Sequence, residues 1–247
     1  MSKKITPDVL IWKNAESFSM AAAHFFVTAC HRCIAKHGRF IVALSGGNTP
    51  KKLYQILATS EFSNNIPWKK VFLFWSDERF VQHTDVESNY RMVKENLLDH
   101  IPIPKKNIFP VPVNDTAKRC AAKYEASIKK VFADKSPVFD WILLGVGEDG
   151  HTASLFPGTD ILKKKKRLVK EVWVQEKKTW RISFTMQLIN KAAQIIFLVS
   201  GKEKATIVAT ALANKKIKPL LPVQLVLPKK GNIYWLIDDE AGALIKK

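Results

Sequence analysis

Apolar residues follow two patterns that alternate along this chain. Short continuous apolar runs suit strands that are buried on both faces, as in parallel sheets. They lie at 9–12, 39–44, 71–75, 138–146, 194–199 and 232–237, and two further strands are expected at 168–174 and 179–184. Elsewhere apolar residues recur at helical spacing. The helices expected from this spacing cover 16–36 and 239–245, begin near 49, 88, 115 and 205, and include a short one around 188.

The order of these elements predicts an α/β fold. Strands that alternate with helices favour a mainly parallel, doubly wound (Rossmann-like) sheet with helices on both faces. No internal repeat and no Gly/Ser-rich linker divides the 247 residues. We therefore expect a single domain over 1–247.

Composition indicates a cytoplasmic protein without a membrane anchor. No apolar run approaches the ~20 residues that a transmembrane helix needs, and residues 1–7 lack the apolar core of a secretory signal. The chain has 3 cysteines, too few for a disulfide framework. Cys30 and Cys33 are spaced like half of a metal or redox motif. Because they lie on the apolar stripe of a predicted helix and no second pair exists, we interpret them as core residues.

The formal net charge of +18 raises the question of nucleic-acid binding. The lysines occur mostly as scattered pairs, and the single dense basic run, 163–167, has no interleaved aromatic residues. This distribution favours a solvated basic surface over a specific nucleic-acid function. Such a surface can still attract anionic metabolites.

Polar side chains follow four of the predicted strands, at 45–49, 77–79, 148–151 and 202–204. Ligands of open α/β sheets bind beyond the carboxyl ends of the strands. We therefore expect these four segments to converge on one edge of the sheet.

The first of these segments, Ser45-Gly-Gly-Asn-Thr-Pro50, joins a buried strand to a helix. Its free backbone N–H groups and the positive end of the helix dipole predict an anion site. Thr49 is the expected N-cap of the helix, with Pro50 in the first turn. The segment matches neither nucleotide-binding glycine fingerprint, so a nucleotide is not indicated.

The third segment supplies a candidate base, His151, with the carboxylate of Asp149 two residues before it. No nucleophile elbow is evident, and His151 lacks the spacing of a zinc site. A histidine beside an anion site and several cations suits hydrolysis or isomerisation of a small phosphorylated molecule, with the histidine as general base. Neither a metal nor an organic cofactor is expected.

Three blocks of the chain resemble the 6-phosphogluconolactonase family: 45–50, 75–81 together with 88–90, and 145–158. The resemblance extends over nearly the whole chain and ends with Arg181 and the turn at 201–204. It implies a three-layer α/β/α fold, shared with glucosamine-6-phosphate deaminases and ribose-5-phosphate isomerases. It also implies hydrolysis of 6-phospho-D-glucono-1,5-lactone to 6-phosphogluconate, the second step of the oxidative pentose phosphate pathway.

The resemblance implies roles for individual residues. His151 activates the attacking water and Asp149 orients the imidazole. The expected partner is the phosphorylated sugar lactone, and a monomer is the simplest oligomeric state. Asp77 and Asn89 contact sugar hydroxyls or brace Arg79, and one of the cations stabilises the oxyanion instead of the phosphate. The phosphate-binding residues implied are Ser45, Gly46, Gly47, Asn48, Thr49, Arg79, Arg181 and Lys204.

The nearest alternative is the aminosugar-phosphate deaminase and isomerase branch of the same superfamily. That branch typically has a tyrosine where this chain has Arg79, and a catalytic glutamate where this chain has Phe156. Losing that carboxylate removes part of the ring-opening machinery, which favours the lactonase. A basic binding protein without activity is the alternative from another class.

Overall fold

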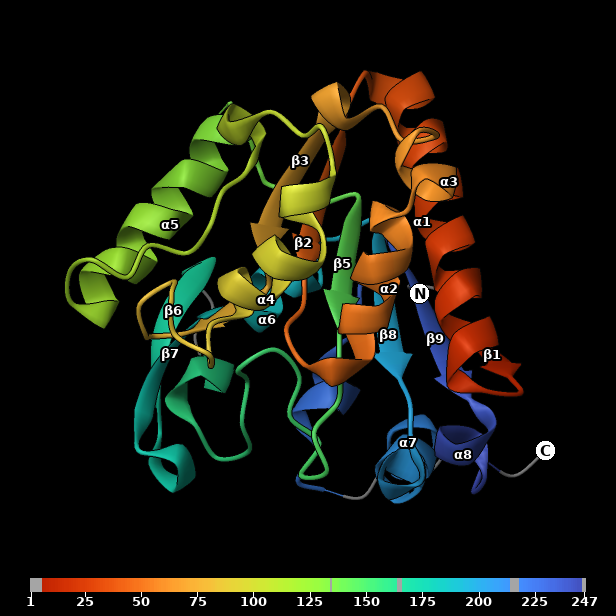
Figure 1. Ribbon diagram of the computed structural model, residues 1–247. Helices are drawn as coiled ribbons and strands as arrows, with labels where there is room; N and C mark the ends of the chain where they lie inside the picture. The colour runs from red at the N-terminus through yellow and green to blue at the C-terminus, as the bar shows by residue number, and fades with distance from the viewer. Residues whose placement is uncertain (1–5, 134, 164–165, 214–217, 246–247) are drawn as a thin grey trace.

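A computed structural model describes residues 6–133, 135–163, 166–213 and 218–245. Its centre is a six-stranded sheet in the order β1-β9-β8-β5-β2-β3, in which every neighbouring pair is parallel (Figure 1). The strands are β1 (Asp8–Trp12), β2 (Phe40–Leu44), β3 (Val71–Trp75), β5 (Trp141–Leu144), β8 (Gln194–Val199) and β9 (Asn232–Asp238). The predicted α/β fold with a mainly parallel sheet is confirmed.

Burial explains why the apolar runs were good predictors of these strands. Every residue of β2, β5 and β8 is buried, because helices cover both faces of the sheet centre. A strand in that position needs apolar side chains on both faces and therefore shows no alternation. The edge strand β1 has instead a mixture of exposed and half-buried residues.

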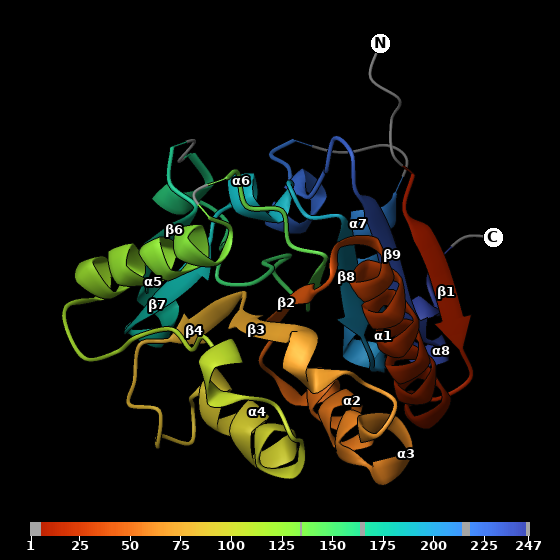
Figure 2. The same cartoon turned by 90° about the horizontal axis from the view of Figure 1, so that it is seen from above.

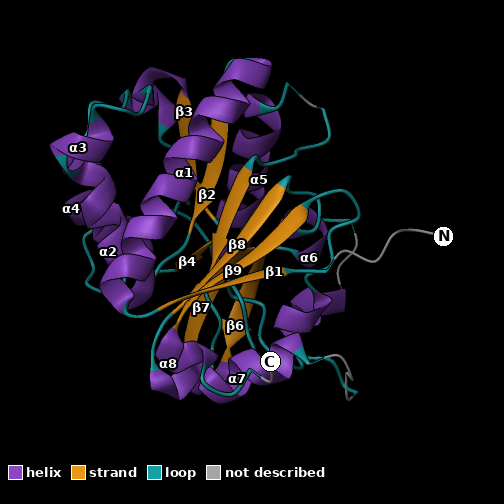
Figure 3. Cartoon of the chain, turned by 90° about the vertical axis from the view of Figure 1, so that its right-hand side faces the viewer, coloured by secondary structure: helices purple, strands orange, loops and turns teal. Residues whose placement is uncertain are grey.

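Helices lie on both faces of the sheet, giving three layers. Figures 2 and 3 show α1, α2, α3 and α4 on one side of the sheet and α5 and α6 on the other. The helices are α1 (Ala15–His37), α2 (Asn48–Ala58), α3 (Ser60–Ser63), α4 (Asn89–Asn96), α5 (Ala117–Val131), α6 (Met186–Ile189), α7 (Ala205–Leu212) and α8 (Asp239–Gly242). Helix α1 begins after the N-cap Asn14 and ends at Gly38, whose φ of 82° is easily adopted only by glycine.

A second, antiparallel sheet was not anticipated from the sequence. It has the order β4-β7-β6, with β4 at Asp77–Arg79, β7 at Thr179–Phe184 and β6 at Val169–Val174. The charged segment after β3, which the sequence did not indicate to be a strand, is therefore itself one. Its backbone pairs with β7, so that Arg79 lies opposite Arg181. One hydrophobic cluster includes residues of both sheets, which packs the small sheet against the large one.

The basic run 163–167 contacts α5 through Arg167. Within the basic run 163–167, residues 164 and 165 lie outside the described residues, whereas the Arg167 side chain bonds to Glu125 of α5.

Among the described helices, none is long and apolar enough to cross a membrane. Cys30, Cys33 and Cys120 are all buried and unbonded to one another, as expected of core residues.

Candidate active site

A cavity of about 350 Å³ opens beyond the carboxyl ends of β2, β5 and β8, beside the small sheet. The four polar strand ends therefore converge, as predicted from parallel strand order. Every predicted site residue except Asp149 lines this cavity. The predicted residues in its wall are Ser45, Gly46, Gly47, Asn48, Thr49, Asp77, Arg79, Asn89, His151, Arg181 and Lys204.

The turn between β2 and α2 presents backbone to the cavity. Gly47, not Thr49, is the N-cap of α2, and its φ of 98° explains why a glycine stands there. The predicted Thr49 cap is wrong because this glycine conformation lets the helix begin two residues earlier, at Asn48. Gly47 makes no side-chain cap bond, so the first N–H groups of α2 remain available for an anion.

Two contacts hold this turn in place. The Tyr54 hydroxyl accepts a hydrogen bond from Ser45 N (3.1 Å) and donates one to Ser45 O (2.7 Å), which fixes the end of β2. On the other side, Gly46 lies so close to Asn89 that a Cβ would overlap its amide group. The absence of a side chain at Gly46 therefore lets α4 approach the turn.

His151 is held from two directions. Its Nδ1 lies 2.6 Å from Oδ1 of Asp149, and the same carboxylate oxygen accepts the His151 backbone N–H at 3.1 Å. The ring also stacks on Phe156, with 4.2 Å between ring centroids. In the neutral tautomer in which Nδ1 donates to Asp149, Nε2 is the unprotonated nitrogen, and it has no hydrogen-bond partner among the described residues. The imidazole is thus oriented as a base toward the cavity that it lines.

The loop that carries His151 follows β5 of the large sheet and is tied to two strands of the small sheet, β4 and β7. Ser154 is fully buried; its hydroxyl donates to Oδ2 of Asp77 (2.6 Å) and its N–H donates to the Ser183 hydroxyl (3.1 Å). Between His151 and Ser154, Ala153 has a φ of 48°, an unfavourable conformation for a residue with a Cβ. These bonds supply the constraint that holds the strained residue in place.

Arg79 and Arg181 bring two positive charges to the cavity wall. They are directly opposite each other in the β4–β7 pairing. Burial lowers the pKa of Arg181, with the charge of Asp77 opposing and that of Arg79 adding to the effect. The Nε atoms of both guanidinium groups are buried without a hydrogen-bond partner among the described residues. Unpaired buried donors of this kind are what an anionic ligand satisfies.

Asp77 and Asn89 were expected either to contact sugar hydroxyls or to brace Arg79, and the contacts of Arg79 differ from the second expectation. Its Nη1 donates to the backbone carbonyl of Glu87 (2.6 Å) and lies 3.5 Å from that residue's carboxylate. Asn89 donates instead to the Asp77 carbonyl (2.9 Å). Among the described residues, Glu87 is therefore the one that hydrogen-bonds the guanidinium group of Arg79, and Asn89 is bonded to Asp77 instead.

Sequence reasoning missed Glu78, a buried carboxylate directly beneath the site. One oxygen accepts the N–H groups of Arg79 and Asn89 (both 2.7 Å). The other accepts Tyr90 N–H (2.8 Å) and the Ser88 hydroxyl (3.1 Å). Burial raises the pKa of Glu78 to about 7, although these backbone donors lower it. Glu78 therefore joins β4 to the start of α4. In the sequence, the only signal of this role was the position of Glu78 between two predicted site residues, Asp77 and Arg79.

Lys204 enters the cavity from the turn after β8. Its Nζ lies 3.8 Å from the carboxylate of Glu148, which follows β5, so the ion pair links two of the converging loops. Glu203 also lines the cavity beside Lys204 and was not predicted. The wall is nevertheless predominantly cationic around the two arginines and this lysine.

An α/β protein with a cationic pocket for a small anionic ligand is the class that this fold and site define. The chain belongs to the family described as glucosamine-6-phosphate isomerases/6-phosphogluconolactonase, whose sequence profile matches residues 13–235.

Similar curated proteins carry the second of these names. A 6-phosphogluconolactonase of Synechocystis sp. is 38% identical over 242 residues, covering 96% of this chain and 98% of that protein. Another from Nostoc sp. is 39% identical over 221 residues, covering 88% of this chain and 89% of that protein. The resemblance seen in the sequence is thus confirmed over most of the chain.

Solved structures agree with this relationship. A 6-phosphogluconolactonase from Trypanosoma cruzi superposes with a TM-score of 0.88 at 27% identity, covering 100% of this chain and 99% of that chain. The enzyme of the same name from Leishmania guyanensis gives a TM-score of 0.88 at 26% identity, covering 98% and 100%. A monomeric glucosamine-6-phosphate deaminase shares the fold, with a TM-score of 0.80 at 22% identity.

Proposed function

We propose that this chain hydrolyses 6-phospho-D-glucono-1,5-lactone to 6-phosphogluconate, the second step of the oxidative pentose phosphate pathway. The names of its relatives support this reaction. The observation that carries the proposal is the His151–Asp149 pair in a pocket with three cations. A carboxylate-held base and a cationic wall are what hydrolysis of an anionic ester requires.

In the proposed mechanism, His151 acts as general base. Its Nε2 takes a proton from the water that attacks the C1 carbonyl of the lactone. The tetrahedral intermediate then expels the ring oxygen, and the imidazolium returns the proton to that oxygen as the ring opens. Asp149 keeps Nδ1 protonated and stabilises the transient positive charge of the ring.

The cations divide between two tasks in this proposal. The phosphate lies against the first turn of α2 and between Arg79 and Arg181, where the buried Nε donors are unpaired. Lys204, on the β8 side of the cavity, is left for the developing oxyanion. Asp77 and Asn89, which are hydrogen-bonded to each other, present the remaining polar surface to the sugar hydroxyls.

Aminosugar-phosphate deamination or isomerisation is the second candidate, because the family includes both activities. Phe156 argues against it. Its ring stacks on His151, at the position where the deaminase branch typically carries a catalytic glutamate. Without that carboxylate, the position that stacks on His151 provides no acid to open an aminosugar ring.

The proposed function is tested by generating the lactone in situ and comparing its decay with the spontaneous rate. The wild-type protein should accelerate hydrolysis, and His151→Ala should lower kcat by at least about a hundredfold. His31→Ala is the matched control, since this exposed histidine hydrogen-bonds the Asn65 carbonyl and is not among the residues that line the cavity. Acceleration that survives in His151→Ala would discard the mechanism, and activity on glucosamine-6-phosphate alone would select the alternative.

We also propose that the protein works in the cytoplasm as a single-domain monomer that does not bind nucleic acid. The scattered distribution of lysines supports the absence of nucleic-acid binding. Light scattering measures the mass in solution. A salt titration with generic DNA tests the last point, because binding that persists at moderate salt would contradict it.

A further inference from the structure

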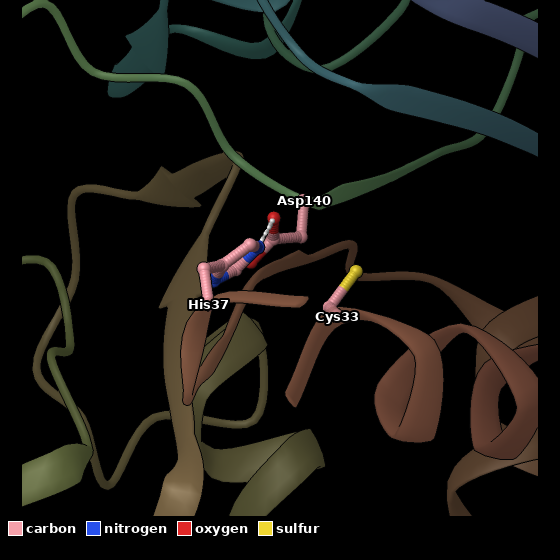
Figure 4. A group of neighbouring side chains, drawn as sticks. All are labelled: Cys33, His37 and Asp140. Carbon is pink, nitrogen blue, oxygen red and sulfur yellow. Dashed lines mark hydrogen bonds and ion pairs between the residues drawn. The ribbon is translucent and has the colours of Figure 1, made fainter. Parts of the chain in front are cut away.

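A cluster of three metal-ligand side chains lies at the other end of β5 from the cavity. Cys33 and His37 belong to the last turns of α1, and Asp140 is the residue directly before β5 (Figure 4). The cavity begins after β5, at Gly145. At about 3.3 Å per strand residue, the five residue steps from Asp140 to Gly145 separate the two places by roughly 17 Å.

The three side chains already converge. One ligand atom from each residue lies within 4.8 Å of the other two. Nε2 of His37 lies 2.9 Å from Oδ1 of Asp140. In a tetrahedral zinc site the ligand atoms are about 3.3–3.6 Å apart, given metal–ligand bonds of about 2.0–2.3 Å. Small side-chain movements therefore suffice to place a cation between the three residues.

Local structure accounts for this convergence. Cys33 and His37 are four residues apart on a helix, so their side chains lie on one face, a turn apart. The second oxygen of Asp140 accepts the backbone N–H of Ile41 (2.8 Å), which fixes the carboxylate and leaves Oδ1 directed at His37. Hydrogen bonds of this kind orient the ligands of known metal sites.

We propose that Cys33, His37 and Asp140 form a binding site for a divalent cation of borderline softness, with Zn²⁺ as the best match. A set of one sulfur, one nitrogen and one oxygen suits zinc and disfavours magnesium and calcium, which prefer oxygen ligands. The side chain of His37 is 39% exposed and that of Asp140 is 9% exposed. The cation thus enters from the solvent side, where water completes its coordination.

Binding requires the loss of one proton. Burial, with a smaller contribution from Asp140, raises the pKa of the Cys33 thiol to about 11, although Arg32 and Lys36 act to lower it. Without a metal the thiol is protonated at neutral pH. On binding, the Cys33 sulfur exchanges its proton for the cation, and the proton passes to solvent.

The alternative is a plain ion pair between His37 and Asp140. A histidine in the last turn of α1 interacts favourably with the helix dipole, and the pair would fasten the helix to the start of β5. That arrangement uses neither Cys33 nor a metal. The two interpretations therefore differ in whether the Cys33 sulfur becomes a ligand.

Cobalt titration of the EDTA-treated full-length protein distinguishes them, because Co²⁺ replaces Zn²⁺ and absorbs light. Wild type should bind one equivalent, with the visible bands of a tetrahedral site and a near-ultraviolet thiolate charge-transfer band. Added Zn²⁺ should displace both. Cys33→Ser should lose the charge-transfer band, and His37→Gln and Asp140→Asn should weaken binding by at least about tenfold.

Cys30→Ser and His31→Gln are the matched controls, since both residues lie on α1 outside the cluster. Both controls should keep the spectrum. Absence of a thiolate band in wild type with Co²⁺ in large excess would overturn the proposal, as would a band lost in Cys30→Ser and kept in Cys33→Ser.

Thermal unfolding of wild type gives a second measurement that does not depend on the stability of any variant. Zn²⁺ should raise the Tm in proportion to the logarithm of its free concentration, because the cluster exists only in the folded chain. Zn²⁺ should also protect Cys33 from alkylation, as mapped by peptide mass. A Tm unchanged by Zn²⁺ together with unprotected Cys33 would contradict the proposal.

Discussion

Individual residues without reactive groups determine the position of His151. A Cβ at Gly147 would overlap Nδ1 and Cε1 of the His151 ring and approach the Asp149 carboxylate. Gly147 is also hydrogen-bonded across the turn, donating to the His151 carbonyl (2.9 Å). The imidazole thus occupies the space that a side chain at Gly147 would need.

Gly147→Ala should therefore displace the imidazole and lower kcat by about tenfold or more, since misplacing a catalytic group by an ångström is costly. Gly242→Ala is the control: this glycine lies in α8, outside the cavity lining, and an added Cβ there makes only ordinary contacts, at 3.4 Å or more. Steady-state lactone hydrolysis compares the two variants. Equal kcat values would show that the His151 position does not depend on Gly147.

At the scale of elements, the sequence predicted best where burial leaves one pattern possible. The apolar runs at β3 and β8 match the strands residue for residue, because both faces of these strands are covered. The small sheet was missed because β4 contains only Asp77, Glu78 and Arg79, and its partner β7 lies about a hundred residues away. No local pattern records such a pairing.

The functional residues also fall into two groups: those whose role the sequence suggests and those whose role depends on how distant elements pack. His151 and Asp149 are two residues apart, so one turn brings them together and the sequence is sufficient to suggest the pair. Glu78 takes its role from donors in α4, and Asp140 lies far from Cys33 in the chain. Contacts of this kind depend on how elements pack, which residue spacing does not encode.

Glu125 joins α5 to β6 and gives this contact a distinct pH dependence. Its carboxylate accepts hydrogen bonds from Lys129 (2.8 Å), Arg167 (2.9 Å), and the N–H groups of Leu168 (3.0 Å) and Val169 (3.2 Å). Burial acts to raise the pKa of Glu125, but these bonds outweigh it and lower the pKa from 4.5 to about 2. A depressed pKa stabilises the fold above the unfolded value, and this contribution is lost as the pH falls from about 4.5 toward 2.

Glu125→Gln should reduce the free energy of unfolding at pH 7 by about 1–3 kcal/mol, because the amide cannot accept all of these bonds. The difference from wild type should shrink at pH 3. Urea denaturation at both pH values measures it, with Glu95→Gln as the control, since Glu95 forms an exposed pair with Arg91. A difference that is the same at pH 7 and pH 3 would mean that the charge of Glu125 is not responsible.

For the whole molecule, the net charge of +18 has a consequence for substrate capture. A positive field over the surface accelerates the arrival of an anion, and salt screens this field over about 10 Å at 0.1 M. The effect acts on association and not on the chemical step.

Raising the salt concentration should therefore lower kcat/KM for the phosphorylated lactone several-fold while leaving kcat nearly constant. Stopped-flow or steady-state hydrolysis over a range of ionic strength measures both constants. The unphosphorylated lactone is the control, because a neutral substrate should show little dependence of kcat/KM on salt. An equal salt effect on both lactones would exclude electrostatic attraction.

The register that sets Arg79 against Arg181 also affects selectivity. Like charges held opposite each other across two strands repel. This repulsion raises the free energy of the pocket when no anion is bound, and a neutral sugar does not reduce it. In the proposed complex a dianion between the two guanidinium groups relieves that repulsion. The pocket thus discriminates between metabolites first by charge and then by shape. Replacing either arginine also changes the contribution of the other arginine to anion binding.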